Sequence, residues 1–221
     1  KYLPKCLEAL NHQTFSKENY EVIVSDNNST DKTQEIAKQF GARVVQAQKQ
    51  GNTFALEKGW ASAKGDIIAG TDADTVPDSR WLEEISNTFS DEKIVGLTGK
   101  ATTDFDSLFL KIFTSVLYDL FLRISFACGV PNLSGFNIAF RTEAYNKVGG
   151  INVTLTMSTD VDLGKRLKKI GKVVYSPNVK ATTSARRWKD GFWKTLWEYI
   201  DGYISVNFLH KPPVTKQKVI R

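Results

Sequence analysis

Cysteine and histidine are scarce in this chain, and their scarcity excludes several kinds of site. The 221 residues contain two cysteines and two histidines. Cys6 and Cys128 lie far apart in apolar surroundings, so we expect neither a disulfide framework nor a thiolate zinc cluster. His12 and His210 lack a metal-binding spacing such as His-Glu-x-x-His, which argues against a histidine zinc site. Any bound metal must therefore be held by oxygen ligands, and the chain suits a reducing cytosolic compartment.

Long apolar runs and biased segments are also lacking. Hydrophobic residues make up 41% and charged residues 24% of the chain, which is typical of one globular domain with a sizeable core. Segment 108–128 is rich in large apolar residues, but Lys111, Asp119 and Arg123 interrupt it. We therefore expect an amphipathic helix there and not a membrane span.

The first residues of the chain follow helical spacing. Leu3, Cys6, Leu7 and Leu10 recur at helical intervals, and Pro4 suits a first turn. In an alternating α/β chain, a helix that feeds a strand normally follows an earlier strand. We therefore expect that about one strand is missing upstream of this sequence.

Strand and helix signals then alternate along the chain. Helices are predicted to end at Gly41 and Gly65, and apolar residues from Trp81 to Phe89 mark another helix. The predicted strands are 20–25, 42–47, 66–70, 136–141 and 173–175, and a later helix is predicted at 158–170. This alternation predicts an α/β fold with a mostly parallel central sheet and helices on both faces.

Two carboxylates follow the apolar run 66–70. Asp72 and Asp74 lie beyond the end of the predicted strand, where open α/β sheets bind ligands. Carboxylates in such a place can share Mn²⁺ or Mg²⁺ with a diphosphate, which suggests nucleotide-sugar chemistry. The alternative is that they form a turn and cap the following helix.

Four segments, in order, resemble those of family 2 glycosyltransferases, which have the GT-A fold. They are the nucleotide-binding turn at 21–31, the D-x-D segment at 65–74, the acceptor-side strand at 134–141 and the catalytic-base helix at 159–171. The resemblance spans nearly the full chain. It implies a GT-A-like, Rossmann-like fold and a metal-dependent, inverting transfer of a sugar from a nucleotide-diphosphate donor to a hydroxyl or lipid-phosphate acceptor. Such reactions assemble polysaccharides, glycolipids and glycoprotein glycans.

The resemblance also assigns roles to individual residues. Asp160 is implied to be the catalytic base that removes the acceptor's proton, and Thr159 stands where the family carries glutamate. Asp74 is implied to hold the metal with help from Asp72, which alternatively approaches ribose or sugar hydroxyls. Asp26 is implied to accept hydrogen bonds from the nucleotide's base or ribose. Without the resemblance, Asp26 reads as a turn-forming acid and Asp160 as a first-turn helix charge.

Two further groups are candidates for donor binding. Lys49 and Gly51 lie in a loop where they could contact phosphate or base, although a solvated loop lysine is the alternative for Lys49. The segment 184–188 resembles a Q-x-x-R-W block, with Ser184 in place of glutamine. Arg187 and Trp188, together with the preceding arginine, would close the donor site or line the acceptor path. A basic surface patch beside a packed tryptophan is the alternative.

Positive charge is concentrated toward the C-terminal end. The formal net charge is +6, and residues 186–221 hold eight Lys or Arg against three Asp or Glu. Large aromatic residues accompany this charge on a predicted helix, a composition that suits an interfacial helix on anionic lipid, with packing on the sheet as the alternative. We expect no nucleic-acid partner. The expected location is cytoplasmic, with peripheral attachment to the cytoplasmic face of a membrane.

We interpret residues 1–221 as a single glycosyltransferase domain with three functional parts. These are a nucleotide-sugar-binding half at 1–104, an acceptor and catalytic-base half at 105–185, and a basic aromatic helix and tail at 186–221. Fold alone does not establish activity, so a noncatalytic nucleotide-sugar or membrane-binding module of the same fold is the main alternative. A nucleotidyltransferase is a third option, which product analysis would distinguish.

Overall fold

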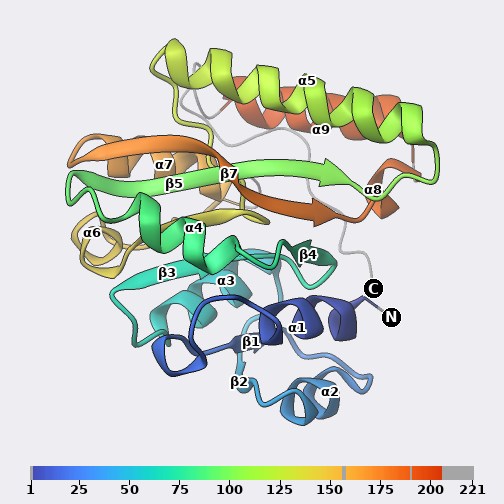
Figure 1. The fold of residues 1–221 in the computed structure, drawn as a ribbon, viewed down its shortest axis with the longest axis vertical. Helices are drawn as coiled ribbons and strands as arrows, with labels where there is room; N and C mark the ends of the chain where they lie inside the picture. Colours follow the sequence, from blue (N-terminus) through green and yellow to red (C-terminus); the bar gives the residue numbers. More distant parts are fainter. Residues whose placement is uncertain (1, 156–157, 190, 206–221) are drawn as a thin grey trace.

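The computed structural model describes residues 2–155, 158–189 and 191–205 (Figure 1). Its strands are β1 (Ile23–Asp26), β2 (Arg43–Gln46), β3 (Ile67–Gly70), β4 (Thr75–Pro77), β5 (Ile94–Thr103), β6 (Ile138–Arg141) and β7 (Lys172–Thr183). Its helices are α1 (Leu3–Asn11), α2 (Thr33–Gln39), α3 (Asn52–Ala61), α4 (Trp81–Thr88), α5 (Leu108–Ala127), α6 (Thr142–Lys147), α7 (Thr159–Lys168), α8 (Arg186–Lys189) and α9 (Phe192–Ile204), with a short 3₁₀ turn η1 (Lys17–Asn19).

The strands form two sheets. Strands β1 and β2 pair in parallel, so Asp26 and Gln46 end their strands side by side. The other five strands are ordered β3-β6-β5-β7-β4. In that sheet β5 and β7 are parallel, whereas β6 runs antiparallel to both of its neighbours and β4 runs antiparallel to β7.

The α/β fold with helices around a central sheet is confirmed, and the sheet is mixed and not purely parallel: β3, β5 and β7 run in one direction, and β6 and β4 run in the other. Helical crossovers in the first half predicted parallel pairing. The second half departs from that pattern because β6 follows the long helix α5 and enters between β3 and β5 in the opposite direction. Mixed sheets of this kind are common among large α/β folds.

Strand β6 joins the two halves of the hydrophobic core. Its side chains alternate between the faces of the sheet, as the strand period of two requires. Ile138 and Phe140 pack with Trp60 in one cluster, while Ala139 packs with Trp81 in the other. All three β6 residues are fully buried, so both faces of the sheet are covered at its centre.

A third cluster lies around the two-stranded sheet. Leu7 of α1 packs there with Ala37 of α2 and Ala42, and Val24 and Val44 of the strands pack against them. The helical spacing at the start of the sequence thus forms the helix that it predicts. The expectation of a further strand upstream concerns residues outside this sequence and stays a prediction.

Helices α5 and α9 lie together over β5 and β7, at the top of Figure 1. The prediction of a helix from 108 to 128 is confirmed, because α5 covers Leu108–Ala127. Among residues 2–155, 158–189 and 191–205, no helix is long and apolar enough to cross a membrane. Both cysteines are free, as expected from the sequence: Cys6 is buried and Cys128 is exposed.

Candidate active site

The two aspartates that follow β3 belong to a tight turn into β4. The Thr75 amide donates a hydrogen bond to the Asp72 carbonyl at 3.0 Å, which closes a four-residue turn. The thiol of buried Cys6 on α1 lies 3.6 Å from the same carbonyl. Thr71, just before the turn, donates its hydroxyl to the Phe136 carbonyl at 3.0 Å. The turn is therefore fixed from two sides, by the first helix and by the segment leading into β6.

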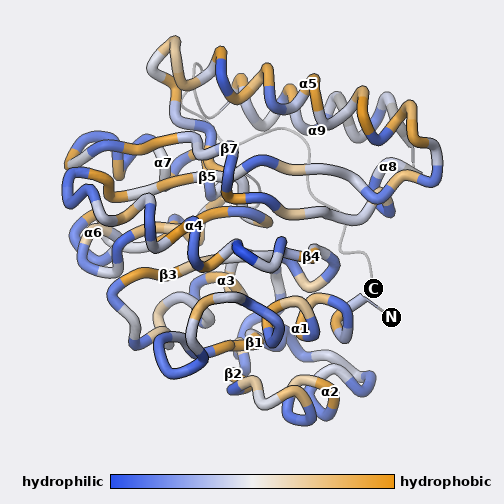
Figure 2. Tube along the Cα trace, viewed as in Figure 1, coloured by the Kyte–Doolittle hydropathy of each residue, from blue (hydrophilic) through white to orange (hydrophobic). Residues whose placement is uncertain are grey.

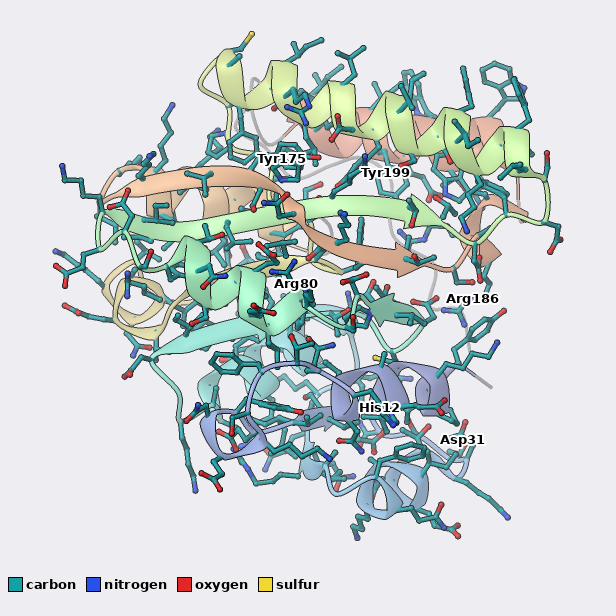
Figure 3. All side chains as sticks on the ribbon, in the orientation of Figure 1. His12, Asp31, Arg80, Tyr175, Arg186 and Tyr199 are labelled. Atoms are coloured by element: carbon teal, nitrogen blue, oxygen red, sulfur yellow. The ribbon has the colours of Figure 1, made fainter. Side chains whose placement is uncertain are left out.

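Strand β7 brings the distant basic segment to this turn. Its last residue, Thr183, is paired with Thr75 of β4, and their hydroxyls are 3.0 Å apart. The Ser184 amide donates to the Asp74 carbonyl at 3.1 Å. One turn further on, the Arg186 guanidinium forms an ion pair with Asp74, with 2.9 Å between Nη2 and Oδ2. Figure 3 shows Arg186 between α8 and α1, and its guanidinium lies 5.4 Å from the Tyr2 ring centroid.

Asp72 lies among charges from three parts of the chain. The pKa of its carboxyl group is raised to about 6, first because the surrounding protein removes hydration and then because Asp74 is close; Asp160 adds to the effect, and Arg187 and Arg186 oppose it. The residue is still accessible to solvent at the turn. The solvent-accessible Asp72 therefore has two further acids, Asp74 and Asp160, and two arginines, Arg186 and Arg187, near it.

Asp160 is held at the start of α7. Its Oδ2 accepts a hydrogen bond from the Gly135 amide at 2.7 Å, and its Oδ1 accepts one from the Val161 amide at 2.9 Å. Burial raises the pKa of Asp160, while these backbone hydrogen bonds act in the opposite direction. A carboxylate with a raised pKa accepts a proton more readily than an ordinary aspartate. The preceding Ser158 has left-handed backbone angles, with φ of 57°, where the chain turns into the helix.

The Gly135 segment is itself anchored in the core. The Ser134 amide donates to the Thr98 hydroxyl of β5 at 3.2 Å, and the Ser134 hydroxyl is hydrogen-bonded to the half-buried Tyr118 of α5. Asn137, two residues after Gly135, is fully buried. Its side chain accepts from Trp81 Nε1 at 2.8 Å and donates to the carbonyls of Lys100 and Val179 at 3.0 and 3.1 Å. These contacts fix the backbone amide that holds Asp160.

Asp26 lies at the end of β1, in the two-stranded sheet. It is buried, with 1% of its surface exposed. Its Oδ1 accepts from the Ser29 amide at 3.2 Å and its Oδ2 from the Gln34 amide group at 2.7 Å. The alternative of a turn-forming acid therefore has direct support, and a role in base recognition stays a prediction.

Asn27 ties the loops after β1 and β2 together. Its Nδ2 donates to the Lys49 carbonyl at 2.8 Å, and its Oδ1 accepts from the Gly51 amide at 2.7 Å. Gly51 has φ of 140°, a conformation that residues with a side chain rarely adopt, and directly precedes α3. The Lys49 side chain is exposed and its Nζ lies 5.5 Å from the Phe54 ring centroid. The loops that carry the three candidate residues Asp26, Lys49 and Gly51 are thus held next to each other.

Replacing Asn27 with alanine should release the Lys49–Gly51 loop. Because the Gly51 amide loses its acceptor, we expect its hydrogen exchange to accelerate about tenfold, equivalent to the loss of about one hydrogen bond. Amide exchange measured by NMR would test this result. Gln48→Ala, in the same exposed loop, is the matched control. Unchanged exchange at Gly51 in the Asn27 variant would contradict this account of the loop.

The basic segment reaches α9 through aromatic contacts. The Arg187 guanidinium lies 6.0 Å from the Tyr199 ring centroid, and the Trp188 ring centroid lies 5.9 Å from the same ring. Tyr199 is 46% exposed, and Figure 3 shows it on the side of α9 that faces the sheet. The surrounding protein raises its pKa, Arg187 lowers it, and Asp72 and Asp160 raise it further. Tyr199 therefore lies beside the same group of charges.

A divalent cation fits the oxygen donors of the Asp72–Asp74 turn. The described part of the chain contains no group of three or more His, Cys, Asp or Glu suited to one ion. Mg²⁺, however, is commonly held by one or two carboxylates, with substrate phosphates and water completing its shell. The like charges of Asp74 and Asp160 around Asp72 favour a cation at this point. Asp72 and Asp74 thus suit an ion that arrives with a diphosphate.

The structure adds residues that sequence reasoning did not assign to the site. Tyr199 was read only as part of an aromatic helix, and the Gly135 amide has no side-chain signal that could reveal it. Arg186 was grouped with its two neighbours, whereas the structure pairs it specifically with Asp74. Asp162, two residues after Asp160, forms an ion pair with Arg166 at 2.8 Å.

Two relatives are similar in sequence to part of this chain. Glycosyltransferase AglE of Haloferax volcanii is 38% identical over 94 residues, which cover 40% of this chain and 31% of the relative. A dolichyl N-acetyl-α-D-glucosaminyl phosphate 3-β-D-2,3-diacetamido-2,3-dideoxy-β-D-glucuronosyltransferase of Methanococcus voltae is 29% identical over 111 residues, which cover 45% of this chain and 35% of the relative. The matched part thus spans about a third of the length of each relative.

A solved structure and a family model extend the comparison. The mannosyltransferase PcManGT of Pyrobaculum calidifontis, solved with GDP-Man and Mn²⁺, has a TM-score of 0.76 and 17% sequence identity, over 93% of this chain and 59% of that chain. At that identity the likeness establishes the GT-A fold alone. The model described as Glycosyl transferase family 2 matches residues 1–149, about two thirds of the sequence. Together with the order of its motifs, this match shows that the chain belongs to glycosyltransferase family 2.

Proposed function

We propose that this chain catalyses metal-dependent, inverting transfer of a sugar from a nucleotide-diphosphate donor to an acceptor hydroxyl or lipid phosphate. The observation that carries the proposal is the convergence of Asp72, Asp74 and Asp160 with two arginines from the segment after β7. A module that only binds a nucleotide sugar has no need of a fixed carboxylate on the acceptor side. Family membership supports the reaction class.

The donor is proposed to lie between the two edges that carry candidate residues. Asp26, with Lys49 and Gly51, would contact the base, ribose or phosphate. Asp74 and Asp72 would hold Mn²⁺ or Mg²⁺, which when bound neutralises charge on the diphosphate leaving group. Arg186 forms an ion pair with Asp74 at 2.9 Å. When Asp74 holds the metal ion instead, Arg186 would be released to bind the diphosphate. Arg187 and Trp188 would close the donor site beside Tyr199.

The acceptor is proposed to approach Asp160. As its proton leaves, the acceptor oxygen attacks the anomeric carbon on the face opposite the nucleotide, which inverts the configuration. Asp160 takes the proton, and the hydrogen bonds from the Gly135 and Val161 amides keep the carboxylate oriented for this step. The name of the Methanococcus relative describes a dolichyl N-acetyl-α-D-glucosaminyl phosphate substrate, which supports a lipid-linked acceptor in glycan assembly. We expect such an acceptor to be met at a membrane surface on the cytoplasmic side.

This scheme assigns functions to the three parts of the sequence. Residues 1–104 would supply the donor-binding loops and the D-x-D turn, and residues 105–185 the acceptor side and the base. Residues 186–221 would supply the arginines, the aromatic helix and the tail, although 190 and 206–221 lie outside the described residues. The whole would act as one unit, because the pairing of β4 with β7 links the first part to the second and the Arg186–Asp74 ion pair links the first part to the last.

Calorimetric titration with nucleoside diphosphates and nucleotide sugars, with and without Mn²⁺, tests the donor site. We expect one nucleotide to bind in a Mn²⁺-dependent way and Asp74→Asn to weaken that binding about tenfold or more, because an ionic oxygen ligand is lost. Asp78→Asn makes the same charge change in the exposed residue that follows β4 and should bind normally. Equal binding by wild type and the Asp74 variant would remove the metal assignment.

Product analysis separates the alternatives. Sugar transfer releases a nucleoside diphosphate, whereas nucleotidyl transfer releases pyrophosphate. A chain that binds the donor but releases neither product with any acceptor would support the noncatalytic module.

A further inference from the structure

Helix α5 turns its polar side chains toward the protein. Buried Ser115 donates to the Ala101 carbonyl of β5 at 3.3 Å, and buried Ser125 donates to the Val130 carbonyl at 2.7 Å. Between them, the Tyr118 hydroxyl is hydrogen-bonded to Ser134, and Asp119 accepts a hydrogen bond from Tyr175 of β7. The side of α5 that packs on the sheet is therefore largely polar.

The opposite side of α5 is apolar and exposed. Phe109 is 72% exposed and Val116 is 60% exposed, which are large fractions for such side chains. The exposed set is Leu108, Phe109, Leu110, Ile112, Phe113, Val116, Leu117, Leu120, Phe121 and Ile124. A helix in contact with water normally shows the reverse arrangement, with its apolar stripe toward the core. Figure 2 shows apolar residues recurring along the whole of α5 at the top of the molecule.

Helix α9 extends this face. Its Tyr203 contacts α5 through the Phe121 ring, with 5.3 Å between centroids, and through the Ser125 hydroxyl at 3.1 Å. Two tryptophans of α9 are exposed, Trp193 at 78% and Trp197 at 63%. Contiguous apolar patches of this extent mark interaction sites, and exposed indoles are typical of membrane interfaces. We call the ten exposed α5 residues with Trp193 and Trp197 the α5–α9 face.

The charges around the α5–α9 face are mainly positive on its exposed side. Lys194 is exposed between the two tryptophans, and Arg123 is exposed on α5. The one acid of α5, Asp119, is turned inward and paired with Arg123 at 2.7 Å. On α9, Glu198 and Asp201 are only partly exposed, and Asp201 accepts from the Ser205 hydroxyl at 3.1 Å. The sequence that follows α9, residues 206–221, contains four Lys or Arg and no Asp or Glu.

We propose that the α5–α9 face lies flat on an anionic lipid bilayer, with its apolar side chains at the boundary between headgroups and acyl chains. Apolar residues flanked by tryptophan and cations suit that environment, because lipid phosphates neutralise the cations while the acyl region takes up the apolar side chains. A second copy of the chain is a poorer occupant, since a symmetric contact would place the exposed Lys194 of both copies at one interface. Helix α5 lies along this surface as a rod of about 30 Å.

This placement puts the candidate active site next to the bilayer. Tyr199 lies on α9, on the same helix as the exposed tryptophans, and contacts Arg187 of the site. A lipid-carried acceptor would then reach Asp160 without leaving the membrane surface. The docking itself rests on α5 and α9 alone, so it can fail or hold independently of the proposed transfer.

Vesicle co-sedimentation of the full 221-residue chain, without donor or metal, tests the α5–α9 face. We expect binding to vesicles of phosphatidylcholine with phosphatidylglycerol, weaker binding to phosphatidylcholine alone, and weakening by salt. Phe113→Glu combined with Leu117→Glu should reduce partitioning at least about tenfold, because both exposed side chains would face the acyl boundary. Ile170→Glu introduces the same kind of charge at another exposed apolar position and should leave binding unchanged.

Fluorescence provides a readout on the unaltered protein. Brominated lipids should quench the tryptophan emission, since Trp193 and Trp197 would enter the bilayer while Trp60 and Trp81 stay in the core. Absence of vesicle binding, or equal binding by wild type and the α5 double variant, would overturn the proposal. So would a wild-type dimer that the double variant converts to a monomer, because the second copy would then be the occupant. Transfer activity lost in Asp160→Asn with vesicle binding retained would separate the two proposals.

Discussion

Asp160→Asn is expected to reduce sugar transfer by about 10²- to 10⁴-fold while donor binding is unchanged, which is the contribution of a general base. Asparagine has nearly the same shape and can still accept a hydrogen bond from the Gly135 amide through its oxygen, so the helix start should stay intact. What it cannot do is take the acceptor's proton. The measurement is turnover at saturating donor, together with donor affinity by calorimetry.

Asp162→Asn is the matched control, two residues further along α7. Its carboxylate is paired with Arg166 at 2.8 Å, and that arginine also donates to the carbonyls of Val148 and Gly150. The control variant should lose some stability and keep its turnover. Near-normal turnover by the Asp160 variant, with the protein folded, would remove the base assignment. Equal losses in both variants would point to α7 as a structural element only.

Asn137→Leu is expected to lower the free energy of unfolding by about 3 to 5 kcal/mol. The substitution leaves the Trp81 indole N–H and the carbonyls of Lys100 and Val179 without their partner inside the core. Each buried polar group left unpaired costs about 1 to 3 kcal/mol. Leucine fills the space, so the loss reports hydrogen bonding and not a cavity. Urea unfolding followed by fluorescence would measure it.

Asn87→Leu, at an exposed position of α4, controls for the change of residue type and should alter stability by less than about 0.5 kcal/mol. A change of similar size in both variants would show that Asn137 does not carry the network assigned to it. If the protein folds with Asn137→Leu, the hydrogen bond from the Gly135 amide to Asp160 should also weaken. The reason is that the substitution loosens the Ser134–Asn137 turn, which carries that amide.

Helix positions and the first strands could be predicted from local patterns. The capping and periodicity signals for α2, α3, α4 and α5 depend on residues within a few positions of one another. The family resemblance, based on the order of four loose motifs, agrees with the match to residues 1–149. Strand β5 escaped prediction because Gly96, Thr98, Gly99 and Lys100 interrupt its apolar residues, although its polar Thr98 is fully buried.

The direction of β6 and the pairing of β4 with β7 depend on tertiary contacts and have no local signal. Gly99 illustrates the reason, since a side chain there would meet the Val179 carbonyl at 2.1 Å and the Asn137 amide at 2.5 Å. That need for a small residue arises from a strand and a loop far along the chain. The same holds for Arg186, whose charge was visible in the sequence while its partner Asp74 was not.

The pairing of β4 with β7 also sets the order in which the chain can complete its candidate site. Asp74 and Arg186 are 112 residues apart in the sequence. Thr75 forms its hydrogen bond with Thr183, which is 108 residues further along. Contacts with such sequence separation form late, because the intervening loop must first be ordered. During synthesis the segment 1–149 therefore emerges with its aspartates but without the strand that holds their turn. The last segment described, from β7 to α9, supplies the partners that fix the Asp72–Asp74 turn, so unfolding that begins at this end should release that turn first.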